Sequence, residues 1–393
     1  MKILSVNAGS SSLKFQMYEM PEEKVLISGT FERIGIGGGF YTIKLNGEKI
    51  KKERELENHA AAVQILIDEL LENKVIESLD EIKGVGHRIV HGGEKYASSV
   101  LIDDDVIKTV EELSDLAPLH NPANLIGVKT FMELIPNAIQ VGCFDTAFHQ
   151  TMDKREYLYP VPYEWYTDYG VRRYGFHGMS HNYIANRTAE ILGNKAAKII
   201  SCHIGNGGSL CAIKDGKSID TSMGFTPNAG LMMGSRSGDI DATLIPFIMG
   251  KTGESLEEVI NDLNKKSGYL GVSGISSDSR DIEDAAAEGN ERAILAQDMY
   301  VEKIVNYIAE YYLELGGADA IVFTAGVGEN SAKTRAAIVD RLAPLGIKLD
   351  SEANNVRGEE RLISTPDSTV KVYIIPTDEE VMIARDTFAF YKK

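Results

Sequence analysis

Arginine and histidine residues recur beside glycine in loops that follow apolar runs of this sequence. Arg88 lies in GHRIVHGGE, His177 lies in RRYGFHG, and Arg236 lies in MMGSRSGDID. A guanidinium group binds carboxylate or phosphate through two parallel hydrogen bonds, and it also stabilises a phosphoryl group during transfer. A single arginine is more often a solvated surface residue, but its repeated placement beside glycine favours anionic substrates and phosphoryl-transfer chemistry.

Three glycine-rich turns at predicted strand ends are the second chemical signal. They read NAGSSS from residue 7, HIGNGG from residue 203 and TAGVGEN from residue 324. Glycine lets the backbone approach an anion closely, and successive N–H groups in such a turn point into one concavity that suits phosphate oxygens. One turn is weak evidence because Gly and Ser also make ordinary hairpins. Three turns predict a bound nucleotide, and Lys14 is either a phosphate ligand or a solvated strand lysine.

Two segments half a chain apart resemble one another. KILSVNAGSSSLKF begins at Lys2 and KIISCHIGNGGSLCAI begins at Lys198, with the same order of apolar, serine and glycine positions. Internal similarity of this kind is typical of duplicated folds, although two buried strands can also match by chance. We expect two related domains, each with a strand, a glycine-rich turn and a returning strand, that face each other across a cleft.

Several known catalytic and binding motifs are incomplete in this sequence. GKS at residue 216 and GKT at residue 250 lack the glycine that a Walker A loop requires five residues earlier. HGMSH places His177 and His181 four residues apart, but it lacks the glutamate of the zinc-protease helix. Neither GxGxxG nor GxSxG occurs. The sequence therefore supports no dinucleotide fingerprint, zinc site or serine nucleophile.

Composition limits the partners. The chain has 393 residues, 43% of them hydrophobic, which is enough for two domains with sizeable cores. Its net charge of −17 repels nucleic acid and anionic membrane surfaces, so positive charge for an anionic substrate must be gathered locally or supplied by a metal. Cys143, Cys202 and Cys211 are expected to be small buried residues in a reducing compartment. With no signal segment and no apolar run of about 20 residues, we expect a cytoplasmic protein.

Short β-branched runs alternate with longer amphipathic ones along the chain. This alternation predicts an α/β fold with mixed sheets. The expected helices cover residues 59–75, 121–134, 180–193 and 290–317. The expected strands cover residues 2–7, 13–18, 82–90, 138–144, 197–204, 209–222, 319–330 and 370–381, several of which include a following loop.

Many long motifs occur along the chain, in the order VNAGSSSLKF, GHRIVHGGEKY, APLHNPANLIG, FDTAFHQTM, RRYGFHGMSH, HIGNGGSL, MMGSRSGDID, FTAGVGENS and PTDEEVMIARDT. In sequence, order and spacing, these motifs resemble those of the acetokinase family, which belongs to the superfamily of acetate and sugar kinases, heat-shock chaperone ATPases and actin. The resemblance implies two duplicated ribonuclease-H-like, actin-like ATPase domains with mixed sheets and a central cleft. It places the N-terminal domain at 1–147 plus a C-terminal helix at 380–393, and the nucleotide-binding domain at 148–379. It also implies a homodimer.

The resemblance further implies reversible, direct in-line transfer of the γ-phosphoryl group of ATP to acetate, giving acetyl phosphate and ADP. Arg88 would hold the acetate carboxylate, His177 and Arg236 would stabilise the phosphoryl group, and Asp145 is the family's essential carboxylate. Asn7 and Glu379 would lie near Mg²⁺, with Mn²⁺ as the alternative metal. The acetate methyl group would contact Val90, Leu119, Phe176 and Pro227. The nucleotide would contact Lys14, His203, Ile204, Gly205, Asn206, Gly207, Asp278, Ser279, Arg280, Gly326, Val327, Gly328, Glu329 and Asn330.

This chemistry agrees with the residue types. A carboxylate acceptor is already ionised at neutral pH and needs charge neutralisation more than a general base. Asp145 is therefore expected to orient metal-bound water or an arginine. Where family members usually carry Leu-Glu in the acyl-pocket loop, this chain has Asn228 and Ala229, and Asp378 replaces a usual Asn.

Other functions remain open on the same residues. Propionate, butyrate or a sugar could replace acetate as acceptor, although apolar pocket walls disfavour a sugar. A propionate kinase is the main alternative, because a hydrophobic pocket discriminates one methylene by only about 1 to 3 kcal/mol. An actin-like or chaperone-like nucleotide switch is the alternative from another class, since a fold does not determine function.

Overall fold

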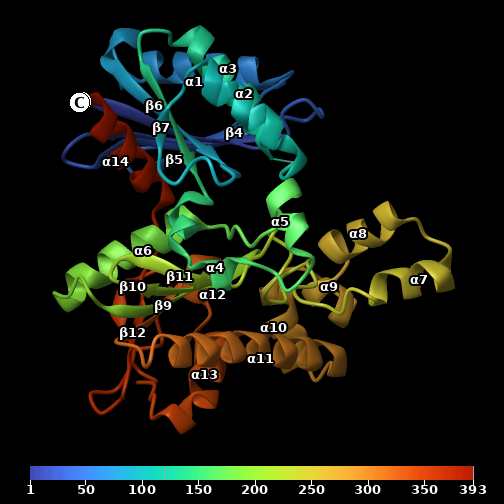
Figure 1. Cartoon of the computed structure of the whole chain (residues 1–393). Helices are drawn as coiled ribbons and strands as arrows, with labels where there is room; N and C mark the ends of the chain where they lie inside the picture. Colours follow the sequence, from blue (N-terminus) through green and yellow to red (C-terminus); the bar gives the residue numbers. More distant parts are fainter. Residues whose placement is uncertain (119, 393) are drawn as a thin grey trace. The chain divides into compact units, whose positions relative to one another are not determined.

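The computed structural model describes residues 1–118 and 120–392, so the predicted pocket residue Leu119 lies outside the described part. The chain forms two compact units. Unit 1 comprises Met1–Phe148 and the C-terminal segment that begins at Asp378, and unit 2 comprises His149–Thr377. In Figure 1, unit 1 therefore contains both the blue start and the red end of the chain.

Unit 1 is built on an eight-stranded sheet in the order β5-β4-β3-β2-β1-β6-β8-β7. Neighbours from β1 to β5 are antiparallel, whereas β6 runs parallel to β1 and β8 runs parallel to β6. The strands are β1 (Lys2–Ala8), β2 (Ser12–Glu19), β3 (Lys24–Glu32), β4 (Phe40–Leu45), β5 (Glu48–Glu53), β6 (Ile82–Ile89), β7 (Val100–Leu101) and β8 (Ile139–Phe144). The helices are α1 (His59–Glu72), α2 (Asp104–Glu112), α3 (Asn121–Leu134) and α14 (Glu379–Tyr391).

Alternation along β1 and β6 directs side chains to both faces of this sheet. Leu4 and Val85 pack in the core that α1 and α3 cover, together with Leu66 and Phe131. The other face receives α14 at a glycine in β6, because a Cβ atom on Gly86 would lie 2.4 Å from Ile383 Cγ2. The absence of that side chain lets the last helix lie directly on the parallel strands, and it brings the start of α14 to their carboxyl ends.

Unit 2 has a six-stranded sheet in the order β11-β10-β9-β12-β14-β13. Its strands are β9 (Lys198–Ile204), β10 (Gly208–Lys214), β11 (Lys217–Thr221), β12 (Ala320–Thr324), β13 (Arg361–Leu362) and β14 (Lys371–Ile374). Its helices are α4 (Lys154–Tyr157), α5 (Tyr163–Tyr169), α6 (Gly178–Leu192), α7 (Leu244–Thr252), α8 (Leu256–Lys265), α9 (Gly268–Ser273), α10 (Ser279–Ala287), α11 (Glu291–Glu314), α12 (Ala325–Asn330) and α13 (Ala332–Arg341). The 24-residue α11 supplies Tyr300, Ile304 and Ile308 to a core shared with β9 and β12.

The two sheets share one central pattern, which explains the similarity between the segments at Lys2 and Lys198. In unit 1, β2 and β1 form an antiparallel hairpin and are followed by parallel β6 and β8. In unit 2, β10 and β9 form the matching hairpin, followed by parallel β12 and β14. The predicted α/β class with mixed sheets is confirmed.

One predicted turn has a different structure. The TAGVGEN segment was expected to be a glycine-rich loop after a strand, but Ala325–Asn330 forms the short helix α12. Ala325, not a glycine, takes the left-handed conformation that reverses the chain, with φ of 65°. Glu329 stabilises this start because its Oε1 accepts a hydrogen bond from the Ala325 N–H at 2.8 Å. The glycines therefore serve a strand-to-helix junction.

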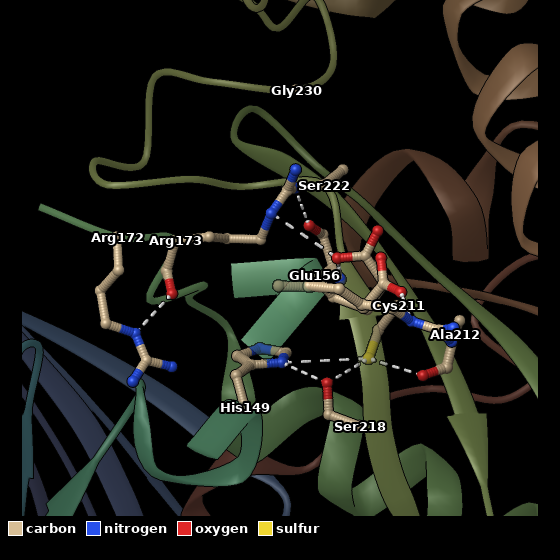
Figure 2. A network of polar contacts seen from close by, with 12 residues as sticks. His149, Glu156, Arg172, Arg173, Cys211, Ala212, Ser218, Ser222 and Gly230 are labelled. Atoms are coloured by element: carbon tan, nitrogen blue, oxygen red, sulfur yellow. Dashed lines mark hydrogen bonds and ion pairs between the residues drawn. The ribbon is translucent and has the colours of Figure 1, made fainter. Parts of the chain in front are cut away.

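His149 at the start of unit 2 predicts an acid-sensitive fold. Its Nε2 lies 2.9 Å from the Phe176 carbonyl oxygen. Its Nδ1 lies 2.8 Å from Ser218 Oγ (Figure 2). Burial lowers the pKa of His149 to about 4. The unfolded chain gains a proton near pH 6.5 and the folded chain only near pH 4, so the stability from neutral His149 is complete above pH 6.5 and is lost as pH falls towards 4.

We expect this loss to reach about 3 kcal/mol in the free energy of unfolding. Denaturant titrations of the wild type and of His149→Gln at several pH values measure it. The variant should show a shallower loss between pH 6.5 and pH 4, because glutamine does not titrate. An identical slope in both proteins would contradict the prediction.

Two further observations bear on the sequence predictions. Cys143, Cys202 and Cys211 are buried and form no disulfide, as expected. Within residues 1–118 and 120–392, no helix has the length and apolar character that crossing a membrane requires.

Candidate functional site

In unit 1, three of the predicted catalytic, substrate-binding and metal-binding residues gather at the carboxyl ends of parallel strands. Asn7 is near the end of β1, Arg88 near the end of β6, and Asp145 directly follows β8. The Arg88 guanidinium donates to both Asp145 oxygens, from Nε at 3.0 Å and from Nη2 at 2.5 Å, and Nη1 lies 3.4 Å from Asn7 Oδ1. Because the ends of parallel neighbours meet at one edge of a sheet, residues distant in sequence form one polar cluster here.

The charged groups of this cluster shift one another's pKa values. Burial disfavours a charged Arg88, but Asp145 and Glu379 outweigh that effect and raise the pKa of the guanidinium above its usual value. Glu379 begins α14, and burial raises its pKa to about 7 despite the opposing effect of Arg88. Asp145 was expected to orient either metal-bound water or an arginine. The structure shows a contact for the second of these roles, because Asp145 bonds the Arg88 guanidinium.

The residues beside this cluster are held by further contacts. Lys14 on β2 forms an ion pair with Glu380. Asp378 caps α14 by accepting a hydrogen bond from the Val381 N–H at 2.9 Å, so the substitution of the usual Asn retains a helix cap. Val90 is buried immediately after β6, and its N–H donates to Asn124 Oδ1 at 3.0 Å. Leu119, which was also predicted to contact the methyl group, is outside the described residues.

In unit 2, His177 and Arg236 border the same small volume next to the glycine-rich turn after β9. A Cβ atom on Gly207 would lie 3.5 Å from Arg236 Nη1 and 3.9 Å from His177 Nε2. Arg236 Nη1 also donates to the Pro227 carbonyl oxygen at 3.2 Å, and burial lowers the pKa of its guanidinium. A guanidinium nitrogen and an imidazole nitrogen therefore both lie within 4 Å of one point beside Gly207.

His177 is held from two sides. It precedes α6 in the left-handed conformation, with φ of 56°, and its Nδ1 lies 2.8 Å from Ser209 Oγ on β10. Its ring stacks on that of His203, with centroids 4.0 Å apart. The adjacent Phe176 is buried, and its carbonyl oxygen lies against His149 as described above. His177 and His181 do lie near one point, as their spacing allows, but a serine hydroxyl occupies it.

A pocket of about 700 Å³ lies within unit 2, and eight of the predicted nucleotide residues line it. They are Gly205, Asn206, Asp278, Ser279, Arg280, Gly326, Val327 and Asn330. Asp278 caps α10, and the Arg280 side chain that bonds it lowers the pKa of the Asp278 carboxyl to about 2. This carboxylate therefore stays ionised at the rim of the pocket.

The other predicted nucleotide residues lie elsewhere. His203, Ile204, Gly207, Gly328 and Glu329 do not line this pocket, and Lys14 belongs to unit 1. Ile204 is fully buried, and Glu329 accepts hydrogen bonds from the N–H groups of Ala325 and Thr377. The Ile204 side chain packs in the core, and the Glu329 carboxylate is bonded to backbone N–H groups. We therefore interpret these two residues as supports for the turn and for α12.

The pocket also contains residues that sequence reasoning missed. They are Gly234, Tyr269, Ser277, Glu283, Asp284, Ser331 and Arg357. Arg357 stands directly before Gly358, so it has the neighbouring glycine that favoured Arg88 and Arg236, but no apolar run precedes it. Tyr269 carried no such signal.

Comparisons with known proteins identify the family of the chain. The model of the acetokinase family matches residues 2–385. A curated acetate kinase from Bacillus cytotoxicus is 57% identical over 387 residues, which is 98% of each chain. The crystal structure of Porphyromonas gingivalis acetate kinase superposes with a TM-score of 0.94 at 49% identity, and that of a propionate kinase from Francisella tularensis with 0.94 at 40%, each over 99% of both chains. The chain therefore belongs to the acetokinase family.

Proposed function

We propose that this chain is an acetate kinase, which transfers the γ-phosphoryl group of ATP reversibly and directly in line to acetate, giving acetyl phosphate and ADP. The observation that carries the phosphoryl-transfer step is that Arg236 Nη1 and His177 Nε2 both lie within 4 Å of the position that a Cβ atom on Gly207 would take, in the turn whose Gly205 and Asn206 line a pocket of about 700 Å³. Acetate as acceptor rests on the curated relative, named an acetate kinase, at 57% identity.

The roles of the residues follow from charge. The nucleotide occupies the unit 2 pocket, where backbone N–H groups of the turn at Gly205 and of α12 receive phosphate oxygens. Arg88, already held by Asp145, uses its remaining N–H donors for the acetate carboxylate. Arg236 and His177 then reduce the repulsion between this carboxylate and the transferring phosphoryl group.

The residues at the start of α14 fit a divalent metal. Among the described residues, no group of three or more His, Cys, Asp and Glu side chains is arranged as a metal cage. Mg²⁺ commonly needs only one or two carboxylates together with substrate phosphates. Glu379 offers a buried carboxylate whose pKa is raised by burial to about 7, and Asn7 offers an amide oxygen. We propose that these two residues hold Mg²⁺, or Mn²⁺, which supplies Lewis-acid charge to the nucleotide phosphates.

The acceptor pocket is proposed to be apolar and small. Val90 and Phe176 are buried, and Pro227 is held beside Arg236 through its carbonyl oxygen. These side chains offer no hydrogen-bonding groups for sugar hydroxyls. Propionate remains the second candidate acceptor, because a propionate kinase superposes with a TM-score of 0.94 at 40% identity.

Formation of acetyl hydroxamate tests the proposal directly. The purified chain, ATP, Mg²⁺, acetate and hydroxylamine should yield acetyl hydroxamate and ADP in equal amounts, and ADP release should require acetate. ATP consumption that does not respond to any added short-chain acid would favour the nucleotide switch.

Because the cysteines are free and buried, we also propose a reducing, cytoplasmic location.

We further propose that the protein is a homodimer that uses α7 and α8. Figure 1 shows these two helices projecting from the rest of unit 2. The sequence of α7, LIPFIMGKT, is mostly apolar, yet none of its residues is buried, and Phe247 is 61% exposed. On α8, Leu256 and Ile260 are also exposed. Exposed apolar side chains that gather on neighbouring elements are typical of a protein–protein interface.

Replacing Phe247 with aspartate should convert the dimer to a monomer, because a charge would be buried without a partner. Light scattering coupled to size exclusion measures this mass. Ile36→Asp is the matched control, since Ile36 in unit 1 is likewise 61% exposed. A wild-type monomer, or an unchanged mass in the Phe247 variant, would refute this interface.

A further inference from the structure

A chain of hydrogen-bonding groups extends from His177 into the interior of unit 2. Ser209 Oγ lies 2.8 Å from His177 Nδ1 and 2.8 Å from His181 Nε2. His181 Nδ1 in turn lies 2.9 Å from Ser201 Oγ. Ser209, His181 and Ser201 are all fully buried, so these partners are fixed by packing.

The number of protons in this chain restricts its states. Burial lowers the pKa of His181 well below its usual value, so its ring is neutral and carries one N–H. A hydroxyl group has one proton, so Ser209 can donate to only one of its two imidazole partners and must accept from the other. The direction in which Ser209 donates therefore determines which nitrogen of a neutral His177 carries its proton.

Only one direction suits a neutral His177 as a donor. If Ser209 donates to His177 Nδ1, then His181 donates from Nε2 to Ser209, Ser201 donates to His181 Nδ1, and the His177 proton is on Nε2. In the reverse direction, a neutral His177 presents an unprotonated Nε2. Since Nε2 is the atom that borders Gly207 beside Arg236, the first pattern places an N–H where the anionic group is expected.

We propose that Ser209, supported by His181 and Ser201, is a positioning residue that holds His177 with an Nε2–H directed at the transferring phosphoryl group. This inference rests on the proposed phosphotransferase function. A second chain of groups restrains the same ring from its face: Thr377 Oγ1 donates to Ser180 Oγ at 2.9 Å, and Ser180 Oγ lies 2.7 Å from Nδ1 of His203, which stacks on His177. Two charged imidazoles stacked 4.0 Å apart would repel one another, so the stacking disfavours a charge on both rings at once.

The experiment compares Ser209→Ala with the alanine variant of a matched serine in the same sheet. Ser218 on β11 is also fully buried, and its hydroxyl lies 2.8 Å from Nδ1 of His149 (Figure 2). Ser218→Ala thus removes a buried serine–histidine contact of the same length in which neither residue has a hydrogen bond to the His177 side chain. Ser209→Cys is the conservative variant, because a thiol is nearly the same size and is a weak donor.

We expect Ser209→Ala to lower kcat by roughly 10- to 100-fold, the usual effect of removing a partner that orients a functional histidine. KM for acetate and for ATP should change by less than about threefold, because the lost interaction acts in the transition state. Ser209→Cys should recover part of kcat, and Ser218→Ala should stay within about threefold of wild type. A Ser209→Ala enzyme with wild-type kcat would overturn the proposal, as would an equal loss in Ser218→Ala.

Nitrogen-15 NMR of the histidine rings provides a readout independent of activity. His177→Asn identifies the His177 signals. In the wild type, the Nδ1 signal should be that of a nitrogen that accepts a hydrogen bond, and in Ser209→Ala it should move towards that of a nitrogen that accepts none. An unmoved Nδ1 signal would overturn the positioning role even in an active enzyme. If the wild type shows no acid-dependent phosphoryl transfer, the proposed function fails, while the NMR comparison still decides whether Ser209 sets the state of His177.

Discussion

Arg236→Ala should lower the rate of acetyl phosphate formation by about 10³- to 10⁵-fold, the range found when a transition-state arginine is removed. The guanidinium lies 3.5 Å from the position of a Gly207 Cβ atom, and burial makes its charge more effective than it would be in water. The hydroxamate assay measures the loss. Because the effect concerns the transition state, kcat should fall much more than KM changes.

Two further variants serve as controls for this result. Arg236→Lys keeps the charge but loses the planar fork, so we expect only partial recovery. Arg187→Ala removes an exposed arginine that pairs with Glu360 on the surface, and it should leave kcat unchanged. If Arg236→Ala keeps near wild-type turnover, Arg236 does not stabilise the phosphoryl group.

Arg88→Gln should lower kcat/KM for acetate by about 10²- to 10³-fold, since charge-assisted bonds to a carboxylate are worth roughly 1.5 to 3 kcal/mol each. Its effect should be specific to the acid. Calorimetry should show unchanged binding of ADP, because the pocket in unit 2 contains no part of Arg88.

Stability is the confounding factor for this variant. Removing Arg88 leaves Asp145 buried without its bidentate partner, at a cost of about 3 to 5 kcal/mol. Arg88→Lys keeps a positive charge beside Asp145 and serves as the folded companion, with a raised KM for acetate because lysine lacks the fork. Equal losses in acetate and ADP binding would contradict a role confined to the acceptor.

Local patterns in the sequence were sufficient to predict much of the fold. The apolar spacing of residues 121–134 predicted a helix, and α3 covers Asn121–Leu134. The similarity between the segments at Lys2 and Lys198 predicted two hairpins, which the structure has in equivalent sheet positions. These features depend on period and turn chemistry within a few residues, which a single sequence contains.

Features that depend on packing were harder to predict. The glycines of TAGVGEN indicated a loop, whereas a left-handed Ala325 and the Glu329 cap make a short helix. That α7 buries none of its residues could not be known from its apolar composition, which is equally typical of a core helix.

The candidate site divides in the same way. Arg88 and Arg236 were selected from residue type and neighbouring glycine alone. The contacts of the site residues depend on which elements are adjacent in the fold. Arg88 bonds Asp145 because β6 and β8 are parallel neighbours. His177 contacts Ser209 because α6 begins beside β10. Such pairs are far apart in the sequence and carry no local signal, so only the structure reveals them.

The most direct test of the central claim, that the acceptor is a short-chain carboxylate and above all acetate, is a comparison of kcat/KM for acetate, propionate, butyrate and glucose with ATP and Mg²⁺. We predict the highest value for acetate, a lower value for propionate by a factor within about 10- to 200-fold, a still lower value for butyrate, and no transfer to glucose. A higher kcat/KM for propionate would make the chain a propionate kinase. ATP hydrolysis at the same rate with every acid, or with none, would contradict the account as a whole.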